Sequence, residues 1–147
     1  SKVMISDFAD PKDLAKNVES ARVISKELKM KVKIRPHINE DGVKNPEYLI
    51  DEKLADLKNI QGLGGIKHGL DSSKKQQCEY TVFNLSAFDT VEPEMLKNKL
   101  NGIYKLYGEK YAGQRMVFIY KRKAVKVSWQ DVVDGKATDL LKELQEQ

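Results

Sequence analysis

Four charged side chains in two nearby segments have the types that phosphate-ester cleavage requires. Arg35 and His37 end one segment, and Asp56 and Lys58 end another. Cleaving RNA without a metal needs a base for the 2′-OH proton, an acid for the leaving 5′-oxygen and cations beside the phosphorane. Histidine suits proton transfer near neutral pH, and lysine and arginine supply fixed positive charge. With Asp56 as the orienting carboxylate, the sequence predicts 2′-OH attack without a cofactor or a metal, giving a 2′,3′-cyclic phosphate and a 5′-OH.

The same region allows a metal-dependent alternative. Glu47 follows Pro46, and Asp56-Leu57-Lys58 comes later, which is the form of the PD-(D/E)xK nucleases. In such sites the carboxylates hold Mg²⁺ and the lysine positions the attacking water. A non-catalytic module that binds RNA or protein would carry the same charged types, so it is a third interpretation.

Further polar residues are candidates for contacts with an RNA backbone. Lys33 shares a strand face with Arg35, and Asn84 and Ser86 end a later strand. One predicted helix carries a cationic face made of Lys67, His68, Lys74 and Lys75. Cations in such a row can neutralise successive phosphates. The preceding glycines, at positions 62, 64 and 65, could form a phosphate-binding nest at the start of this helix.

The elements that must position these groups follow from hydrophobic periodicity. Residues 31–37 alternate between apolar and polar, which predicts a strand with one buried face. Residues 48–50 and 54–58 read as a hairpin joined by a short turn at Asp51-Glu52. Residues 10–30 carry an apolar stripe that predicts a helix, in which Asp10 can act as the N-cap. A third helix after Pro93 should bury Leu96, Leu100, Ile103 and Tyr107.

The order of these elements predicts an α+β fold. We expect residues 1–147 to form a single domain, with a helix at 10–30, a sheet core at 31–128 and a last helix at about 136–147. The sheet should have four or five mostly antiparallel strands. Helices packed on one face would leave the other face to collect the charged residues.

Composition limits the class of protein. The chain has 33% charged and 40% hydrophobic residues, a net charge of +4 and a pI near 9.0, which fits a globular domain and permits a nucleic-acid partner. No apolar run approaches the ~20 residues of a membrane helix, and no signal peptide opens the chain, whose abrupt start suggests a module from a longer protein. The only cysteine, Cys78, excludes an internal disulfide, indicates a reducing compartment and is expected to be a small buried residue.

Two stretches resemble known toxins. They are the run from Asn45 to Lys58, and Ile66-Lys67 with the later segments Lys74–Gln77 and Val82–Leu85. Together they resemble the C-terminal nuclease domains of contact-dependent inhibition and other polymorphic toxins, with relatives in phage polyproteins. Such domains are identified as members of the barnase–EndoU–colicin–RelE (BECR) superfamily of ribonucleases. The chain departs from the family pattern at Glu52, where glycine is usual, and at Asn84, where aspartate is frequent.

The resemblance implies an endoribonuclease toxin that cleaves transfer RNA, with a cognate immunity protein as partner. It implies action in the cytoplasm of a target or host cell after delivery within a larger secreted or phage-encoded polyprotein. On matched positions it assigns functional roles to Asp56, Lys58, His37 and Gln77.

Overall fold

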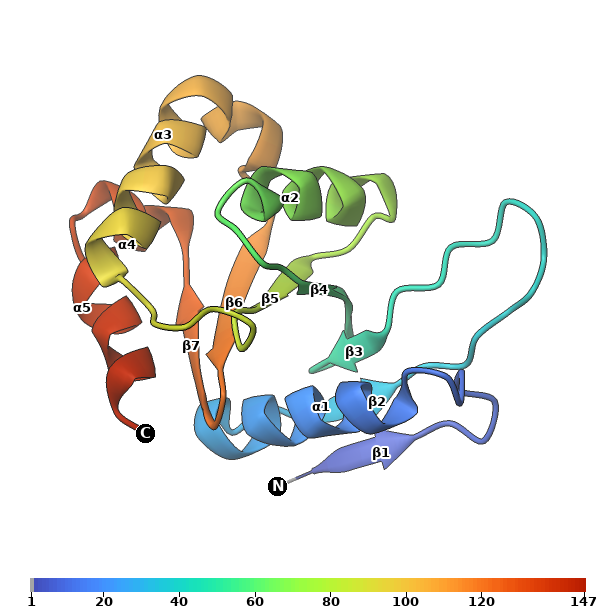
Figure 1. Cartoon of the computed structure of the whole chain (residues 1–147). Helices are drawn as coiled ribbons and strands as arrows, with labels where there is room; N and C mark the ends of the chain where they lie inside the picture. Colours follow the sequence, from blue (N-terminus) through green and yellow to red (C-terminus); the bar gives the residue numbers. More distant parts are fainter. Residues whose placement is uncertain (1) are drawn as a thin grey trace.

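The computed structural model describes residues 2–147 and shows a seven-stranded sheet with helices on both sides (Figure 1). The strands are β1 (Val3–Ile5), β2 (Val32–Ile34), β3 (Tyr48–Ile50), β4 (Lys53–Asn59), β5 (Tyr80–Asn84), β6 (Arg115–Tyr120) and β7 (Lys123–Val127). The helices are α1 (Leu14–Leu28), α2 (Gly65–Lys75), α3 (Pro93–Tyr111), α4 (Trp129–Val133), α5 (Ala137–Lys142) and a 3-10 turn, η1 (Glu143–Gln145). No helix in residues 2–147 is long and apolar enough to cross a membrane.

The sheet is mixed, so the expectation of four or five mostly antiparallel strands was wrong in detail. Its strands lie in chain order from β1 to β7. The pairs β1–β2, β4–β5 and β5–β6 are parallel, and β2–β3, β3–β4 and β6–β7 are antiparallel. The parallel pairs arise because a whole helix separates the two strands of each pair, which is the connection that parallel pairing requires.

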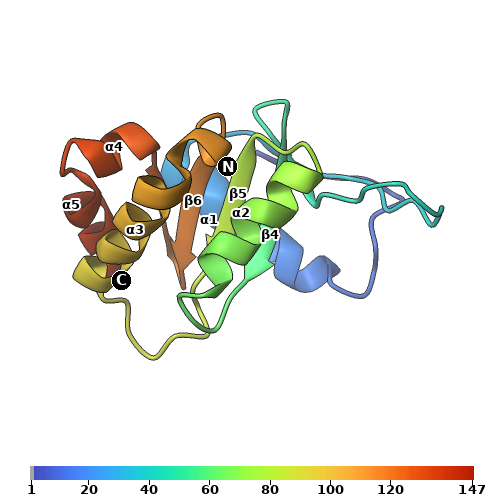
Figure 2. The same ribbon diagram turned by 90° about the horizontal axis from the view of Figure 1, so that it is seen from above.

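Helices cover both faces of the sheet, which corrects the expectation of one open face. On the α1 face, Ile24 of the helix packs with Val32, Tyr48, Leu57 and Val82. On the opposite α2 face, helices α2 to α5 enclose a second core. Seen from above, α2 and α3 lie over β4 to β6 while α1 passes behind these strands (Figure 2). Helix α1 contacts β1 and β2 near one edge and β6 and β7 near the other, so the sheet curves around it.

The terminal helices are shorter than their sequence patterns suggested. Helix α1 begins at Leu14 because Asp10 does not cap it: its Oδ1 accepts a hydrogen bond from the N–H of Lys12 (3.0 Å) and forms a separate turn. The expected helix at 136–147 is divided between α5 and η1. The short helix α4 was not expected, although Ser128 and Asp131 form a capping box that sequence could have revealed.

The predicted hairpin is confirmed. Strands β3 and β4 pair from Tyr48 opposite Ala55 to Ile50 opposite Lys53, with Asp51 and Glu52 between them. Both turn residues have positive φ, 45° and 69°. Two-residue turns of this conformation match the twist of the strands that they join. The absence of glycine at position 52 therefore leaves the turn intact.

Helix α3 bends, which changes the environment of its tyrosines. Tyr107 has non-helical backbone angles (φ −134°, ψ 19°), and its side chain is 39% exposed rather than buried in the stripe. Tyr111 is buried instead, and its carbonyl accepts a hydrogen bond from the indole N–H of Trp129 (2.9 Å). The other expected stripe residues, at 96, 100 and 103, are buried as predicted.

Candidate functional site

Glu47, Asp56 and Lys58 come together on the α2 face of the sheet. Asp56 and Lys58 are two apart in β4, so their side chains emerge on the same face. Glu47 directly precedes β3, the antiparallel neighbour of β4. We call these three residues the carboxylate–lysine cluster. They are the residues of the metal-dependent alternative.

Specific contacts fix each member of the cluster. Nζ of Lys58 lies 2.9 Å from Oδ2 of Asp56. Strand β3 begins at Tyr48, opposite Ala55, so the N–H of Leu57 in β4 has no partner in β3. This N–H donates instead to Oε2 of Glu47 (2.9 Å). The Asp56 side chain is 3% exposed and that of Lys58 is 30% exposed, so the ion pair lies at the boundary between core and solvent.

The carboxyl group of Asp56 is close enough to change the protonation of Glu47. Burial, a hydrogen bond with Asp56 and repulsion by its charge together raise the pKa of Glu47 from 4.5 to about 8. Carboxyl groups with a pKa raised by burial and by a neighbouring carboxyl group are concentrated at functional sites.

Glu47 should make the stability of the protein depend on pH. A folded-state pKa above the unfolded value means that the folded protein binds more protons, so the free energy of unfolding falls as pH rises from 4.5 to about 8. Glu47 keeps some contact with solvent, which screens part of this interaction, so we expect a loss of about 2 kcal/mol. Urea unfolding over this pH range should show this loss in the parent and not in Glu47→Gln.

Glu40→Gln is the control for this measurement, since Glu40 is exposed in the loop between β2 and β3. Its pH profile should follow that of the parent. Identical profiles for the parent and Glu47→Gln would contradict the assigned protonation of Glu47.

Arg35 and Cys78 flank the cluster. Nη1 of Arg35 donates to the carbonyl of Pro46 (3.0 Å), which places the guanidinium beside Glu47. Cys78 is 6% exposed, as predicted. Burial, followed by the charges of Asp56 and Glu47, raises the pKa of its thiol to about 12. A neutral thiol is a poor nucleophile, so Cys78 is a packing residue.

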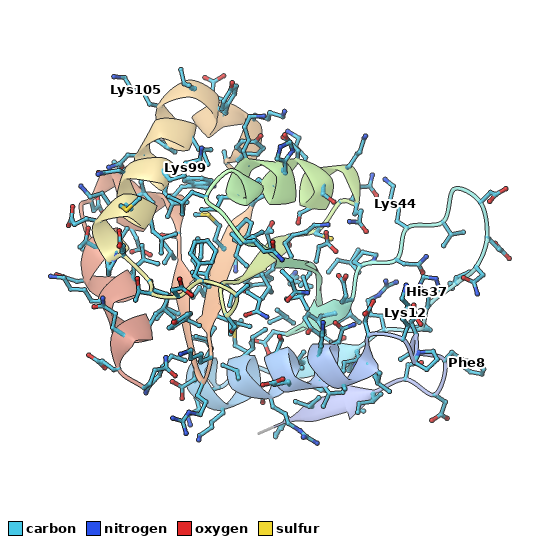
Figure 3. All side chains as sticks on the ribbon, in the orientation of Figure 1. Phe8, Lys12, His37, Lys44, Lys99 and Lys105 are labelled. Atoms are coloured by element: carbon cyan, nitrogen blue, oxygen red, sulfur yellow. The ribbon has the colours of Figure 1, made fainter. Side chains whose placement is uncertain are left out.

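His37 lies apart from the ion pair that it was expected to accompany. It is exposed beyond the end of β2, where its backbone N–H donates to the backbone carbonyl of Phe8 (2.9 Å). Figure 3 shows it near Phe8 and Lys12, where the long loop projects. His37 lines a groove of about 170 Å³ together with Arg35 and Glu47. Asp56 and Lys58 do not line this groove, so the four expected catalytic residues do not form one constellation.

The expected RNA-binding residues are dispersed. Lys33 pairs with Glu52 (2.9 Å), and Lys67 pairs with Asp71 (3.0 Å). Nζ of Lys74 donates to the carbonyl of Lys110 (2.7 Å). His68 and Gln77 are exposed on and after α2. Asn84 lies opposite Asn59 in the neighbouring strand, so the two side chains share a face of the sheet. That face is the α1 face, because Lys58, the residue before Asn59, points to the α2 face.

The sequence pattern missed Gln76, which contacts the cluster directly. Its Nε2 donates to Oδ2 of Asp56 (2.8 Å) from the C-terminal end of α2. The resemblance had singled out Gln77, which is exposed and has a left-handed φ of 59°. No periodicity distinguishes the two glutamines, because helix α2 ends at Lys75 and both lie just beyond it.

Comparisons with known proteins agree on one group. The family model described as "Contact-dependent growth inhibition CdiA C-terminal domain" matches residues 44–125, which contain the whole cluster. A chain from the solved CdiA-CT/CdiI toxin and immunity complex of Burkholderia pseudomallei has a TM-score of 0.61 and 16% identity. The alignment covers 87% of this chain and 99% of that chain, and it shows a shared fold. No curated protein matches the sequence.

The family match spans more than half of the 147 residues, from the long loop to the β6–β7 hairpin. This agrees with the resemblance to contact-dependent inhibition toxins inferred from Asn45–Lys58. The chain therefore belongs to the family of C-terminal domains of the contact-dependent growth inhibition protein CdiA.

Proposed function

We propose that the protein is a nuclease toxin domain that cleaves phosphodiester bonds at the carboxylate–lysine cluster with a divalent cation. The observation that carries this proposal is that Glu47 reaches strand β4 between Asp56 and Lys58, where its Oε2 accepts a hydrogen bond from the N–H of Leu57, with Lys58 2.9 Å from Asp56. The metal-dependent interpretation of the sequence requires this arrangement. The single-domain architecture and the family membership are consistent with it.

The donor set suits Mg²⁺. This cation characteristically binds through one or two carboxylates, together with waters and substrate phosphates. Within residues 2–147 there is no group of three or more His, Cys, Asp and Glu side chains that could hold a metal ion. Glu47 and Asp56 thus provide a partial site that a nucleic-acid substrate would complete. When bound, the cation would polarise the scissile phosphate and neutralise its developing charge.

A divalent cation would displace the proton of the hydrogen bond between the carboxyl groups of Glu47 and Asp56. Oδ2 of Asp56 already accepts from Lys58 and Gln76. Oε2 of Glu47 already accepts from the N–H of Leu57. Lys58, whose side chain is 30% exposed, can reach a bound phosphate and stabilise negative charge there.

Metal-independent cleavage is the second candidate. The groove shared by His37, Arg35 and Glu47 favours it, because the groove places a histidine, a guanidinium and a carboxyl around one opening. In this mechanism His37 acts in proton transfer and Arg35 binds the phosphate. It is the reaction expected of a BECR ribonuclease.

RNA is the substrate that we favour, with transfer RNA first, on the sequence resemblance to toxin ribonucleases. A cognate immunity protein is the proposed protein partner, and the related fold occurs in a toxin and immunity complex. Delivery into the cytoplasm of a target cell as the end of a larger secreted protein fits membership of a C-terminal domain family.

One experiment separates these candidates. The protein is incubated with total RNA, transfer RNA and duplex DNA, with Mg²⁺ or with EDTA, and the product ends are identified. We expect cleavage with Mg²⁺ and none with EDTA. Mg²⁺ should also raise the melting temperature of the parent and not that of Glu47→Gln, because cation binding to the folded state stabilises it.

Cleavage that continues in EDTA and leaves 2′,3′-cyclic phosphates would overturn the metal-dependent proposal in favour of the His37 mechanism. Binding of RNA without new ends under either condition would contradict both and indicate a non-catalytic module.

A further inference from the structure

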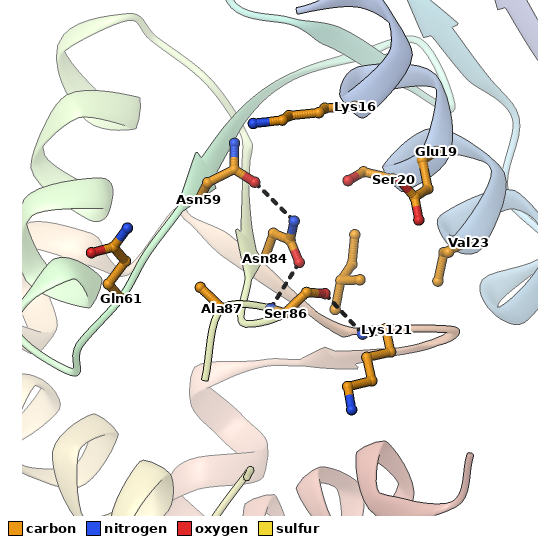
Figure 4. Close-up of a pocket in the computed structure, with 11 residues that line it drawn as sticks. Lys16, Glu19, Ser20, Val23, Asn59, Gln61, Asn84, Ser86, Ala87 and Lys121 are labelled. Atoms are coloured by element: carbon orange, nitrogen blue, oxygen red, sulfur yellow. Dashed lines mark hydrogen bonds between the residues drawn. The ribbon is translucent and has the colours of Figure 1, made fainter. Parts of the chain in front are cut away.

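A second polar cavity lies across the sheet from the carboxylate–lysine cluster. It has a volume of about 340 Å³ and opens between α1, the ends of β4 and β5, and the turn after β6 (Figure 4). Strands β4, β5 and β6 are parallel, so their carboxyl ends meet at this edge. Ligands of open α/β sheets bind outside the carboxyl ends of parallel strands, and this volume lies within the usual range of ligand pockets.

Hydrogen bonds hold the floor of the cavity in a fixed arrangement. Nδ2 of Asn84 donates to Oδ1 of Asn59 (2.8 Å), and Oδ1 of Asn84 accepts from the N–H of Ser86 (3.1 Å). Oγ of Ser86 accepts in turn from the N–H of Lys121 (2.9 Å). These three hydrogen bonds orient the Asn59 amide, whose NH₂ group has no hydrogen-bond partner in residues 2–147. A donor is therefore presented at the cavity without a protein acceptor.

The wall formed by α1 adds one cation and one anion. Lys16 and Glu19 both line the cavity, and neither forms an ion pair within the described part of the chain. In Figure 4 the Lys16 side chain extends toward Asn59, whereas the Lys121 ammonium points away from these residues. Val23 and Ile119 provide apolar surface in the same cavity. The cavity thus offers a cation, an acceptor, an amide donor and a hydrophobic wall.

We propose that this cavity binds one nucleotide of the substrate strand. Single-stranded bases are recognised by apolar packing and by hydrogen bonds to their edges, and amide side chains suit those edges. The Asn59 amide and the Glu19 carboxylate would read the base, and Lys16 would bind the phosphate. The identity of the ligand rests on the proposed nuclease function.

The position of Asn59 explains how one strand could reach both sites. Asn59 follows Lys58 in β4, so the two side chains emerge on opposite faces at the same end of the strand. A strand that passes around this end would place one phosphate at the carboxylate–lysine cluster and a neighbouring nucleotide in the cavity. The cavity would then set the position of the cut.

Nucleotide binding can be measured without cleavage. The parent protein in EDTA is titrated with each nucleoside 5′-monophosphate and separately with inorganic phosphate, and side-chain amide NMR signals are followed. We expect the Asn59 and Asn84 signals to shift with nucleotides. Lys16→Gln and Asn59→Ala should each weaken binding about fivefold, which corresponds to one lost polar contact. Lys105→Gln, on the exposed part of α3 labelled in Figure 3, is the matched control and should bind as the parent does.

Two results would overturn the proposal. One is nucleotide binding that leaves the Asn59 and Asn84 signals unmoved, and the other is phosphate alone binding as tightly as the nucleotides. Lys16 is exposed on α1, so Lys16→Gln tests the site even if Asn59→Ala does not fold. Glu47→Gln should lose cleavage and keep nucleotide binding. Retained cleavage in that variant would refute the proposed function and leave the cavity to be judged by its own titration.

Discussion

Replacement of Lys58 with alanine should slow nucleic-acid cleavage by about 10²-fold or more. A preorganised positive group beside the reacting phosphate typically contributes about 3 kcal/mol to lowering the barrier. Lys58 is held by its ion pair with Asp56 at 2.9 Å and by close packing under α2. The initial rate of transfer RNA cleavage with Mg²⁺ at saturating substrate measures the effect. Lys58→Arg keeps the charge and should recover part of the rate.

Lys97→Ala is the matched control for Lys58→Ala. Lys97 also forms an ion pair, with Glu94 at 3.4 Å, and its side chain is 28% exposed against 30% for Lys58. It lies on α3, away from β4. Lys97→Ala should therefore cleave at the parent rate. If Lys58→Ala also cleaved at the parent rate, Lys58 would have no role in cleavage.

Replacement of Phe83 with alanine should destabilise the protein by about 3 to 5 kcal/mol, as is usual for a fully buried phenylalanine. Phe83 is 0% exposed and stacks on Phe118 with ring centroids 5.3 Å apart. Helix α2 rests on this ring at Gly69, where an added Cβ would lie 2.6 Å from Cε1 of Phe83 and 3.1 Å from Cγ of Lys58. The variant leaves a cavity beside the lysine. Urea unfolding with a linear extrapolation measures the loss.

Leu106→Ala is the control for truncation of a large apolar residue. Leu106 is 74% exposed on α3, so its loss should change the free energy of unfolding by less than about 0.5 kcal/mol. Parent-like stability of Phe83→Ala would mean that α2 does not pack on β5 as described.

The hairpin that carries Asp56 and Lys58 was predictable because its signals are local. Alternation, the two-residue turn and the spacing of the acidic and basic residues all lie within residues 48–58. The pairing of Glu47 with these residues could also be proposed, because antiparallel neighbours in one hairpin have a defined register.

The faces of the sheet were not predictable in the same way. An amphipathic pattern shows that α1 buries one side, but it does not say which face of the sheet receives it. Strand β1 is only three residues long, and none of its side chains is fully buried, so it carries no clear alternating pattern. Its pairing with β2 depends on the chain returning after α1. The position of His37 was not predictable for a related reason. The strand predicted at residues 31–37 ends at Ile34, so the loop that follows, and not strand alternation, decides where the His37 side chain lies.

The mixed sheet limits how quickly the chain reaches its native state. Three of the six strand pairings join partners separated by an entire helix. Bringing such distant segments together costs chain entropy before their contacts form, so high contact order slows folding. An unfolded copy of the chain would therefore pass through a stage in which strand edges are unpaired before Glu47, Asp56 and Lys58 come together.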